Sequence, residues 1–421
     1  MSHFSAHLRR GAVVAVTAGT LLTPLTAGAA PVLVPGGAPA AVSPTPAPPA
    51  PTPSPSQSEV RALTPAVANQ LDAAVQRVMR QANIPGVTVG IWTPGQPSYV
   101  RSFGVADKSD GQPMAPGMFM RIGSETKMFT VSALLQLVDR GKVGLDDPIG
   151  RYVDGVPNGD RITLRQLAEM RSGLFNYSED ADFDKALTSA PQKPFTPQQL
   201  LDYAFKHPVM FEPGAKFFYS NTNLILLGLV VEKESGQHIE DYIRQHILEP
   251  AGMKDTLFPT GSEFPTPHAQ GYTLQTANGK EADSADWNPS WAWAAGAMIS
   301  TLDDLHTWAP TAATGQFPDG TRMISTASQE QRLMTLPAGP FKGAGYGLGI
   351  FDVRGWIGHN GSLPGYEALT VYLPATRTTL VVLCNTDTGY RGQEPSTVLG
   401  AAITRIISPG HVYNLPVTRT G

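Results

Sequence analysis

The chain has 421 residues, of which 41% are hydrophobic and 16% charged, so it has enough apolar side chains to form a large buried core. Its formal net charge of -4 leaves no basic excess to neutralise the phosphates of a nucleic acid, so we expect no nucleic-acid partner. The single cysteine, Cys384, excludes a disulfide scaffold and a cysteine-based metal cluster.

The first thirty residues have the pattern of a secretory signal peptide. Arginines at positions 9 and 10 precede an apolar run over residues 11–30, and residues 27–29 (Ala-Gly-Ala) form a small-x-small cleavage signal. Threonine, glycine and proline interrupt the run, so it is poorly suited to a membrane-spanning helix, which needs about 20 apolar residues. An uncleaved membrane anchor is the alternative. We therefore expect a secreted or cell-envelope protein with no stable membrane span after cleavage of residues 1–30.

Residues 31–58 are rich in proline and alanine and contain ten prolines. Such a segment cannot bury a core and is expected to form an extended, semi-rigid spacer. It either holds a domain away from a surface or is an inert tail, and the sequence leaves both readings open.

The segments after the spacer alternate in character along the chain. Apolar residues at steps of three and four predict a helix over 64–83, and β-forming runs predict strands over 87–92 and 98–105 before a helix over 124–140. The next predicted elements are helices at 164–170, 197–205, 223–235 and 239–248, then strands at 349–353, 356–359, 369–373 and 380–384, and a final helix at 396–407.

Strand-forming sequence thus lies near both ends of the folded part, and helical sequence lies between them. The simplest arrangement is an α+β fold in which one antiparallel sheet is built from both chain ends and covered by helices. A mainly helical insertion at about 146–310 would pack beside the sheet, and residues 411–421 would form a tail.

Residues 123–127 (Gly-Ser-Glu-Thr-Lys) place Ser124 and Lys127 on one face of a predicted helix start. A serine hydroxyl is a poor nucleophile until a neighbouring base takes its proton. A lysine in an apolar site near the positive end of a helix is a candidate base, because its ammonium form is disfavoured there. The Ser124 N–H is also available to an oxyanion. The alternative is a helix-capping serine beside a solvated lysine.

Residues 219–221 (Tyr-Ser-Asn) form a second motif before an apolar helix. The Tyr219 phenol can transfer protons, and the Asn221 amide can hold a substrate carbonyl and a lysine together. A packed tyrosine with Asn221 as a helix cap is the alternative.

Residues 358–366 form a glycine-rich third motif at a strand end. Gly361 lets backbone approach a ligand closely, and the Ser362 N–H is then a second oxyanion donor. His359 supplies a donor or a positive charge. The alternative is a glycine-rich hairpin with an incidental histidine.

In this order, Ser-x-x-Lys, Tyr-x-Asn and His-x-Gly resemble the serine β-lactamase and D-alanyl-D-alanine carboxypeptidase superfamily, in its class C-like branch. The resemblance implies a serine hydrolase domain at 59–410 with the matching fold. It implies that Ser124 is the acylated nucleophile, and that Lys127 and Tyr219 share the acid–base work in an order left open.

The same resemblance gives Asn221 and His359 substrate-binding roles, with Gly361 and Ser362 beside the oxyanion. His359 stands where typical β-lactamases have lysine, so its grip on a substrate carboxylate is expected to weaken as pH rises. No cofactor or metal is implied.

The favoured activity is removal of D-alanine from peptidoglycan stem peptides by an exported enzyme. β-Lactams are expected as covalent ligands. An esterase, a D-amino-acid amidase, a weak β-lactamase or another enzyme of small acyl substrates is the alternative within the family. A non-catalytic wall-binding relative is the alternative outside catalysis.

Overall fold

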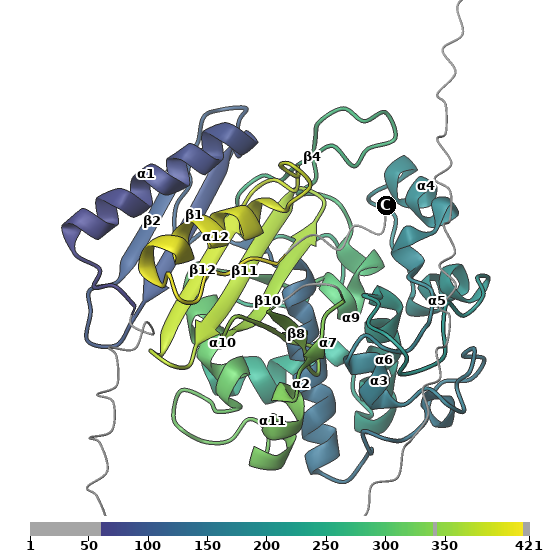
Figure 1. Cartoon of the computed structure of the whole chain (residues 1–421). Coiled ribbons are helices and arrows are strands. Elements are labelled where there is room, and N and C mark those ends of the chain that lie inside the picture. Colours follow the sequence, from purple (N-terminus) through teal and green to yellow (C-terminus); the bar gives the residue numbers. More distant parts are fainter. Residues whose placement is uncertain (1–59, 340–342, 416–421) are drawn as a thin grey trace, which may run out of the picture. The chain divides into compact units, whose positions relative to one another are not determined.

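The computed structural model describes residues 60–339 and 343–415, whose elements are drawn in Figure 1. The expected signal peptide and spacer, residues 1–58, lie outside the described residues, as does the end of the expected tail, residues 416–421.

An antiparallel sheet of eight strands takes its strands from both ends of the described chain, in the order β2-β1-β12-β11-β10-β9-β8-β7. The strands are β1 (Gly86–Trp92), β2 (Tyr99–Gly104), β7 (Leu336–Pro337), β8 (Ala344–Tyr346), β9 (Phe351–Val353), β10 (Trp356–Leu363), β11 (Tyr366–Leu373) and β12 (Thr378–Cys384). The junction between the two ends is the pairing of β1 with β12, in which Val87 lies opposite Cys384. The predicted α+β fold is confirmed.

Helices cover both faces of this sheet because its central strands are apolar on both sides. In β11, Leu369 lies near Gly400 of α12 (Pro395–Ile407). Tyr372 packs with Ala309 of α10 (Leu302–Thr314). Side chains alternate along a strand, so α12 and α10 lie on opposite faces.

Helix α1 (Pro65–Ala82) packs against α12 and completes the layer on that face (Figure 1). It begins after Thr64, whose hydroxyl accepts the Val67 N–H, and it ends at Asn83 in a left-handed conformation. Helix α10 begins inside the predicted insertion at 146–310 but packs on the sheet, so the insertion ends earlier in the chain than we predicted.

The remaining helices lie between β2 and β7 in sequence. They are α2 (Thr126–Asp139), α3 (Leu164–Ala168), α4 (Ala181–Ser189), α5 (Pro197–Phe205), α6 (Asn221–Ser235), α7 (Ile239–Ile243), α8 (Glu249–Ala251), α9 (Trp293–Gly296) and α11 (Thr326–Leu333). Two short strand pairs accompany them, β3 (Met120–Arg121) with β6 (Ile299–Ser300) and β4 (Tyr272–Thr273) with β5 (Ala282–Asp283).

Helix α2 is the central element of the helical part. Residues from Thr126 to Leu137 are buried, because α6 and α9 pack against the helix and α7 and α11 also contact it. A polar side chain at the start of α2 is therefore surrounded by protein rather than by water, which decides the chemistry of Lys127 described below.

The described part of the expected tail packs against the domain. The indole N–H of Trp356 donates to the His411 carbonyl at 2.6 Å, and the Tyr413 N–H donates to the Thr404 hydroxyl at 2.9 Å. Tyr413 is fully buried. The domain therefore extends past residue 410, and the prediction that the tail begins at 411 is wrong for residues 411–415.

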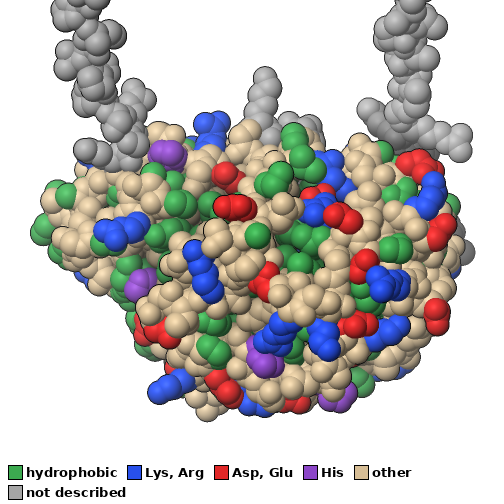
Figure 2. Space-filling model, turned by 90° about the horizontal axis from the view of Figure 1, so that it is seen from below, with side chains coloured by type: hydrophobic (Ala, Val, Ile, Leu, Met, Phe, Trp, Pro, Cys, Tyr) green, Lys and Arg blue, Asp and Glu red, His purple; other side chains and the backbone are tan. Residues whose placement is uncertain are grey.

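On the face drawn in Figure 2, acidic and basic side chains are interspersed, as the small net charge suggests. Within residues 60–339 and 343–415, the helices are too short or too polar to cross a membrane.

Candidate active site

The turn that carries Ser124 packs backbone against backbone on strand β10. Ser124 lies in a 3-10 turn, η1 (Gly123–Glu125), which precedes α2. A Cβ added to Gly123, whose φ is +52°, would lie 2.6 Å from the Ser362 nitrogen. A Cβ added to Gly361 would lie 1.9 Å from the Ile122 carbonyl oxygen and 3.0 Å from the Ser124 nitrogen.

Both glycines are therefore needed for this close approach, and it brings the backbone nitrogens of Ser124 and Ser362 to one place. The side on which Gly361 lacks a Cβ is occupied by the Ile122 carbonyl oxygen.

Lys127 is fully buried and points at three oxygen atoms. Its Nζ lies 3.0 Å from the Ser124 hydroxyl, 2.8 Å from the Asn221 side-chain oxygen and 2.8 Å from the Ala295 carbonyl oxygen. In its neutral form the amine has two N–H groups for the Asn221 and Ala295 oxygens and a lone pair for the Ser124 hydroxyl. Burial lowers the pKa of the Lys127 ammonium well below its usual range, because the charged form loses its hydration. A neutral amine in hydrogen-bond contact with a serine hydroxyl can accept its proton.

Asn221 is fixed from the helical side of the site. Its side-chain N–H donates to the Ser178 hydroxyl at 3.1 Å, and its backbone N–H donates to the Asn176 side-chain oxygen at 3.0 Å. Ser178 in turn donates to Asn176 at 3.0 Å. The Asn221 side chain thus joins Lys127 to this loop, rather than capping α6.

Tyr219, just before α6, lies against the same lysine. The Lys127 Nζ is 4.8 Å from the centroid of the Tyr219 ring. Burial raises the pKa of the Tyr219 phenol above its usual range, although a hydrogen bond with Ser124 lowers it. The phenol therefore stays protonated near neutral pH and is suited to donating a proton.

The charge of the His359 ring differs from the one expected. Its ring is 1% exposed, and its Nε2 lies 3.2 Å from the Tyr346 hydroxyl. Burial, reinforced by the nearby Lys127, lowers the pKa of His359 to about 3. The expectation of a positive charge that grips a carboxylate and weakens near neutral pH is therefore corrected, because the ring is already neutral there.

The structure brings all seven sequence-predicted residues to one place. They are Ser124, Lys127, Tyr219, Asn221, His359, Gly361 and Ser362. The sequence reasoning missed Asn176, Ser178 and Tyr346, which orient Asn221 and His359. No sequence spacing links these three residues to the motifs, because only folding brings the residues and the motifs together. Among the described residues, no group of three His, Cys, Asp or Glu side chains is arranged to hold a metal ion.

A sequence profile of the family described as Beta-lactamase matches residues 71–402, which is most of the chain. The chain belongs to this family. The resemblance inferred from the three motifs is confirmed, and the β-lactamase family is one of serine hydrolases that includes amidases and proteins similar to penicillin-binding proteins.

Two solved structures and one curated protein illustrate the relationship. The D-stereospecific amidohydrolase from Streptomyces sp. is 28% identical with a TM-score of 0.70, over 80% of this chain and 98% of that one. The D-amino acid amidase from Ochrobactrum anthropi SV3 is 28% identical with a TM-score of 0.71, over 81% and 97%. Protein flp of Staphylococcus aureus (strain MW2) is 25% identical over 336 residues, 78% of this chain but only 65% of that protein's length.

Proposed function

We propose that this protein is a serine amidase that cleaves amides of D-configured amino acids through an acyl-enzyme. The observation that carries the proposal is the Lys127 amine, buried and in hydrogen-bond contact with both the Ser124 hydroxyl and the Asn221 side chain. Burial lowers the pKa of this amine and so favours the neutral form, which can act as a base.

In the proposed reaction, the Ser124 oxygen attacks the substrate carbonyl while its proton passes to the Lys127 Nζ. The backbone N–H groups of Ser124 and Ser362 stabilise the negative oxygen. The carbon–nitrogen bond then breaks, and the leaving amine takes a proton from the Lys127 ammonium or from the Tyr219 phenol, which the ammonium reprotonates. Water hydrolyses the resulting ester on Ser124 and restores the enzyme.

The choice of D-configured amides is supported by the relatives. The two D-specific amidases are 28% identical to this chain, and their structures align over 97–98% of their lengths. The names of these two relatives describe the activity that we propose here. The matching fold alone would not favour this choice, because one fold hosts several chemistries.

D-Alanyl-D-alanine carboxypeptidase is the second candidate. The pattern of residues 1–30, from which we propose export to the cell envelope, favours it, because peptidoglycan lies there. The leaving group of that reaction ends in a carboxylate. His359, which the sequence offered as a cation for it, is buried and neutral, so we rank this activity second.

A substrate panel separates the candidates. The purified protein is given D-phenylalanine amide, L-phenylalanine amide, a diacyl-L-Lys-D-Ala-D-Ala peptide and p-nitrophenyl acetate, and release of ammonia, D-alanine or nitrophenol is measured. We expect hydrolysis of the D-amide at least about tenfold faster than of the L-amide. Release of D-alanine without amide hydrolysis would establish the second candidate, and ester cleavage alone would contradict both.

A further inference from the structure

Two glutamates that the proposed reaction does not use are buried beside the oxyanion nitrogens, which are the backbone nitrogens of Ser124 and Ser362. Glu125 follows Ser124 in the η1 turn and is fully buried. Glu367 lies on β11 directly opposite Ser362 of β10 and is 1% exposed. Burying a carboxyl group costs free energy, so two such groups beside one site indicate a role there.

The Glu125 side chain joins the serine turn to the sheet. Its carboxyl has hydrogen bonds with the hydroxyl and with the backbone of Thr370 on β11. Thr370 pairs with His359 of the neighbouring strand β10. Glu125 therefore holds, from the side of the sheet, the same turn that Gly123 and Gly361 allow to approach β10.

Glu367 holds the other oxyanion nitrogen through its own residue. Its carboxyl has a hydrogen bond with the Ser362 side chain, and one of its oxygens accepts from the Ser396 hydroxyl at 2.6 Å. Ser396 lies in the first turn of α12, so Glu367 links Ser362 to the helices that cover the sheet. Like the Glu125 bonds, the bond with Ser362 is poorly aligned, and hydrogen bonds around a free active site often tighten only in the reacting complex.

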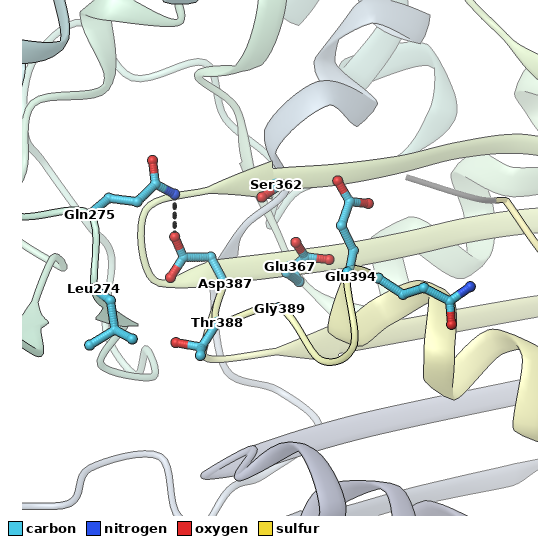
Figure 3. Close-up of a pocket in the computed structure, with 10 residues that line it drawn as sticks. Leu274, Gln275, Ser362, Glu367, Asp387, Thr388, Gly389 and Glu394 are labelled. Atoms are coloured by element: carbon cyan, nitrogen blue, oxygen red, sulfur yellow. Dashed lines mark hydrogen bonds between the residues drawn. The ribbon is translucent and has the colours of Figure 1, made fainter. Parts of the chain in front are cut away.

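A cavity of about 620 Å³ lies beside Ser362 and is also lined by the carboxyl groups of Glu367, Asp387 and Glu394 (Figure 3). Ser362 thus has open space on one side, where packing does not hold its side chain. The hydrogen bond with Glu367 is therefore the contact that fixes the Ser362 side chain beside this space.

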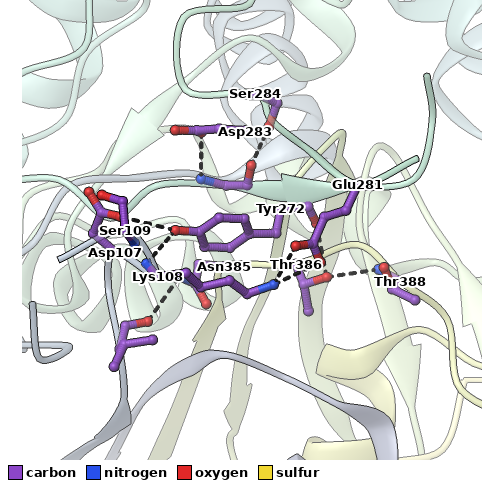
Figure 4. Close-up of polar contacts among 12 residues, drawn as sticks. Asp107, Lys108, Ser109, Tyr272, Glu281, Asp283, Ser284, Asn385, Thr386 and Thr388 are labelled. Atoms are coloured by element: carbon purple, nitrogen blue, oxygen red, sulfur yellow. Dashed lines mark hydrogen bonds and ion pairs between the residues drawn. The ribbon is translucent and has the colours of Figure 1, made fainter. Parts of the chain in front are cut away.

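Strand β12 fixes Glu367 from its other side. Glu367 pairs with the last residue of β12, and the two residues that follow are anchored by hydrogen bonds. The Asn385 amide donates to the Val105 carbonyl at 3.1 Å. The Thr386 hydroxyl donates to the Tyr272 carbonyl at 2.9 Å, within the network that Figure 4 draws. The surroundings of Glu367 are thus set by bonds within the chain, as a positioning residue requires.

Both carboxyl groups are suited to act in their neutral form. Burial raises the pKa of Glu125 well above its usual range, and burial followed by repulsion from Glu394 does the same for the pKa of Glu367. A neutral carboxyl group has one O–H donor and still accepts hydrogen bonds. It can therefore hold a neighbouring residue without placing a negative charge beside the oxyanion.

We propose that Glu125 and Glu367 are positioning residues that hold the two oxyanion nitrogens, one on the serine turn and one on β10, at the separation that the reaction needs. The inference rests on the acyl-enzyme mechanism proposed above, but not on which amide is cleaved. A displacement of about 1 Å at such a site costs about 10²-fold in rate, so small movements of either nitrogen matter. Each glutamate acts through the residue that it holds.

The test uses the full chain and two substitutions at each position. Glu125→Met and Glu367→Met remove the hydrogen-bonding group and keep the side-chain length, whereas Glu125→Gln and Glu367→Gln keep an uncharged hydrogen-bonding group. Glu232→Met is the matched control, because Glu232 is a half-buried glutamate whose pKa burial also raises, at the opposite end of α6 from Asn221. Folding is checked by circular dichroism and thermal unfolding.

Phenylboronic acid reads the oxyanion site directly, because its tetrahedral adduct with a serine places an oxygen there. Its Kd is measured by calorimetry, and kcat and KM are measured with D-phenylalanine p-nitroanilide. We expect each Met variant to raise this Kd and to lower kcat by about ten- to a hundredfold, while KM changes by less than about threefold. The Gln variants and Glu232→Met should stay within about threefold of the unaltered protein in all three values.

Paired substitutions identify the contact through which each glutamate acts. Ser362→Ala should have the effect of Glu367→Met, and the two together should cost no more than either, because they remove the two partners of one bond. Thr370→Val and Glu125→Met should behave in the same way. The Ser362→Ala and Thr370→Val variants also keep the test decisive if a Met variant does not fold.

Unchanged boronate affinity and kcat in the folded variants of both pairs would overturn the inference. Gln variants as impaired as the Met variants would also overturn it, because the negative charge would then be the property that matters. An unaltered protein that binds the boronate without hydrolysing the amide would overturn only the amidase function, and the boronate affinities would still decide the inference. A folded, unaltered protein that binds no boronate would contradict both.

Discussion

The two ends of this site handle charge in opposite ways. At the helical end, hydroxyl, amide and carbonyl oxygens surround one lysine, each within hydrogen-bond distance of its Nζ. At the other end, three carboxylates line a cavity, and one of them, Glu367, is buried. Ser362 belongs to both ends.

The difference indicates which end is complete. Burial disfavours the charged form of Lys127, and its hydrogen bonds are all supplied by the chain, so the catalytic end is preorganised. At the acidic end, burial raises the pKa of Glu367 and of Asp387, so their charged forms are disfavoured there. The first end therefore supplies the chemistry.

Removal of the Lys127 amine at the catalytic end should have the largest effect. Lys127→Ala leaves the Ser124 hydroxyl without its base, and we expect acylation to slow by about 10³-fold or more. The measurement is the rate of labelling by a fluorophosphonate. Lys185→Ala, which removes an exposed lysine from α4, should label at the normal rate. Normal labelling of Lys127→Ala would contradict the role given to the lysine.

The junction between the two ends offers the next largest effect. Gly361→Ala places a Cβ 1.9 Å from the Ile122 carbonyl oxygen, so β10 and the Ser124 turn must separate. Loss of one oxyanion donor costs about 10²–10³-fold in kcat, which is the expected effect.

Gly117→Ala is the matched control for that substitution, because an added Cβ there has no neighbour within 4 Å and its φ is not in the left-handed region. Both variants are first checked for folding by circular dichroism and thermal unfolding. If Gly361→Ala folds and keeps its full kcat, the oxyanion role of this backbone contact is wrong.

A pH series should reveal smaller effects, of about tenfold. Lys127 must be unprotonated to act, and its pKa lies well below the usual value, so the rate of fluorophosphonate labelling should rise with pH and level off well below pH 10.5. His359, with a pKa of about 3, should add no step near pH 6.5. If the rate instead rises only near pH 10.5, Lys127 has an ordinary pKa and is charged at neutral pH, which contradicts its role as the base.

Sequence reasoning found the catalytic end because its residues occur in short motifs. Ser124 and Lys127 are one helical turn apart, and the three motifs keep their order along the chain. The sheet was also predictable, because β-forming runs lie at both ends of the folded part; β1 was predicted at 87–92 and observed at Gly86–Trp92.

What the sequence could not provide was the surroundings of these residues. The neutral state of His359 depends on burial beneath Tyr346 and on nearby Lys127, neither of which has a local pattern. The acidic cavity combines β11 with the segment around residues 387–394, so its carboxylates meet only after folding. Burial and long-range contacts, rather than motifs, decide these features.

Intact-protein and peptide mass spectrometry after fluorophosphonate treatment shows directly whether Ser124 is the nucleophile. We predict one phosphonyl group per chain on the peptide that contains Ser124, and no adduct on Ser124→Ala. An adduct that persists in Ser124→Ala, or its absence from a folded unaltered protein, would contradict the claim that a buried amine activates this serine.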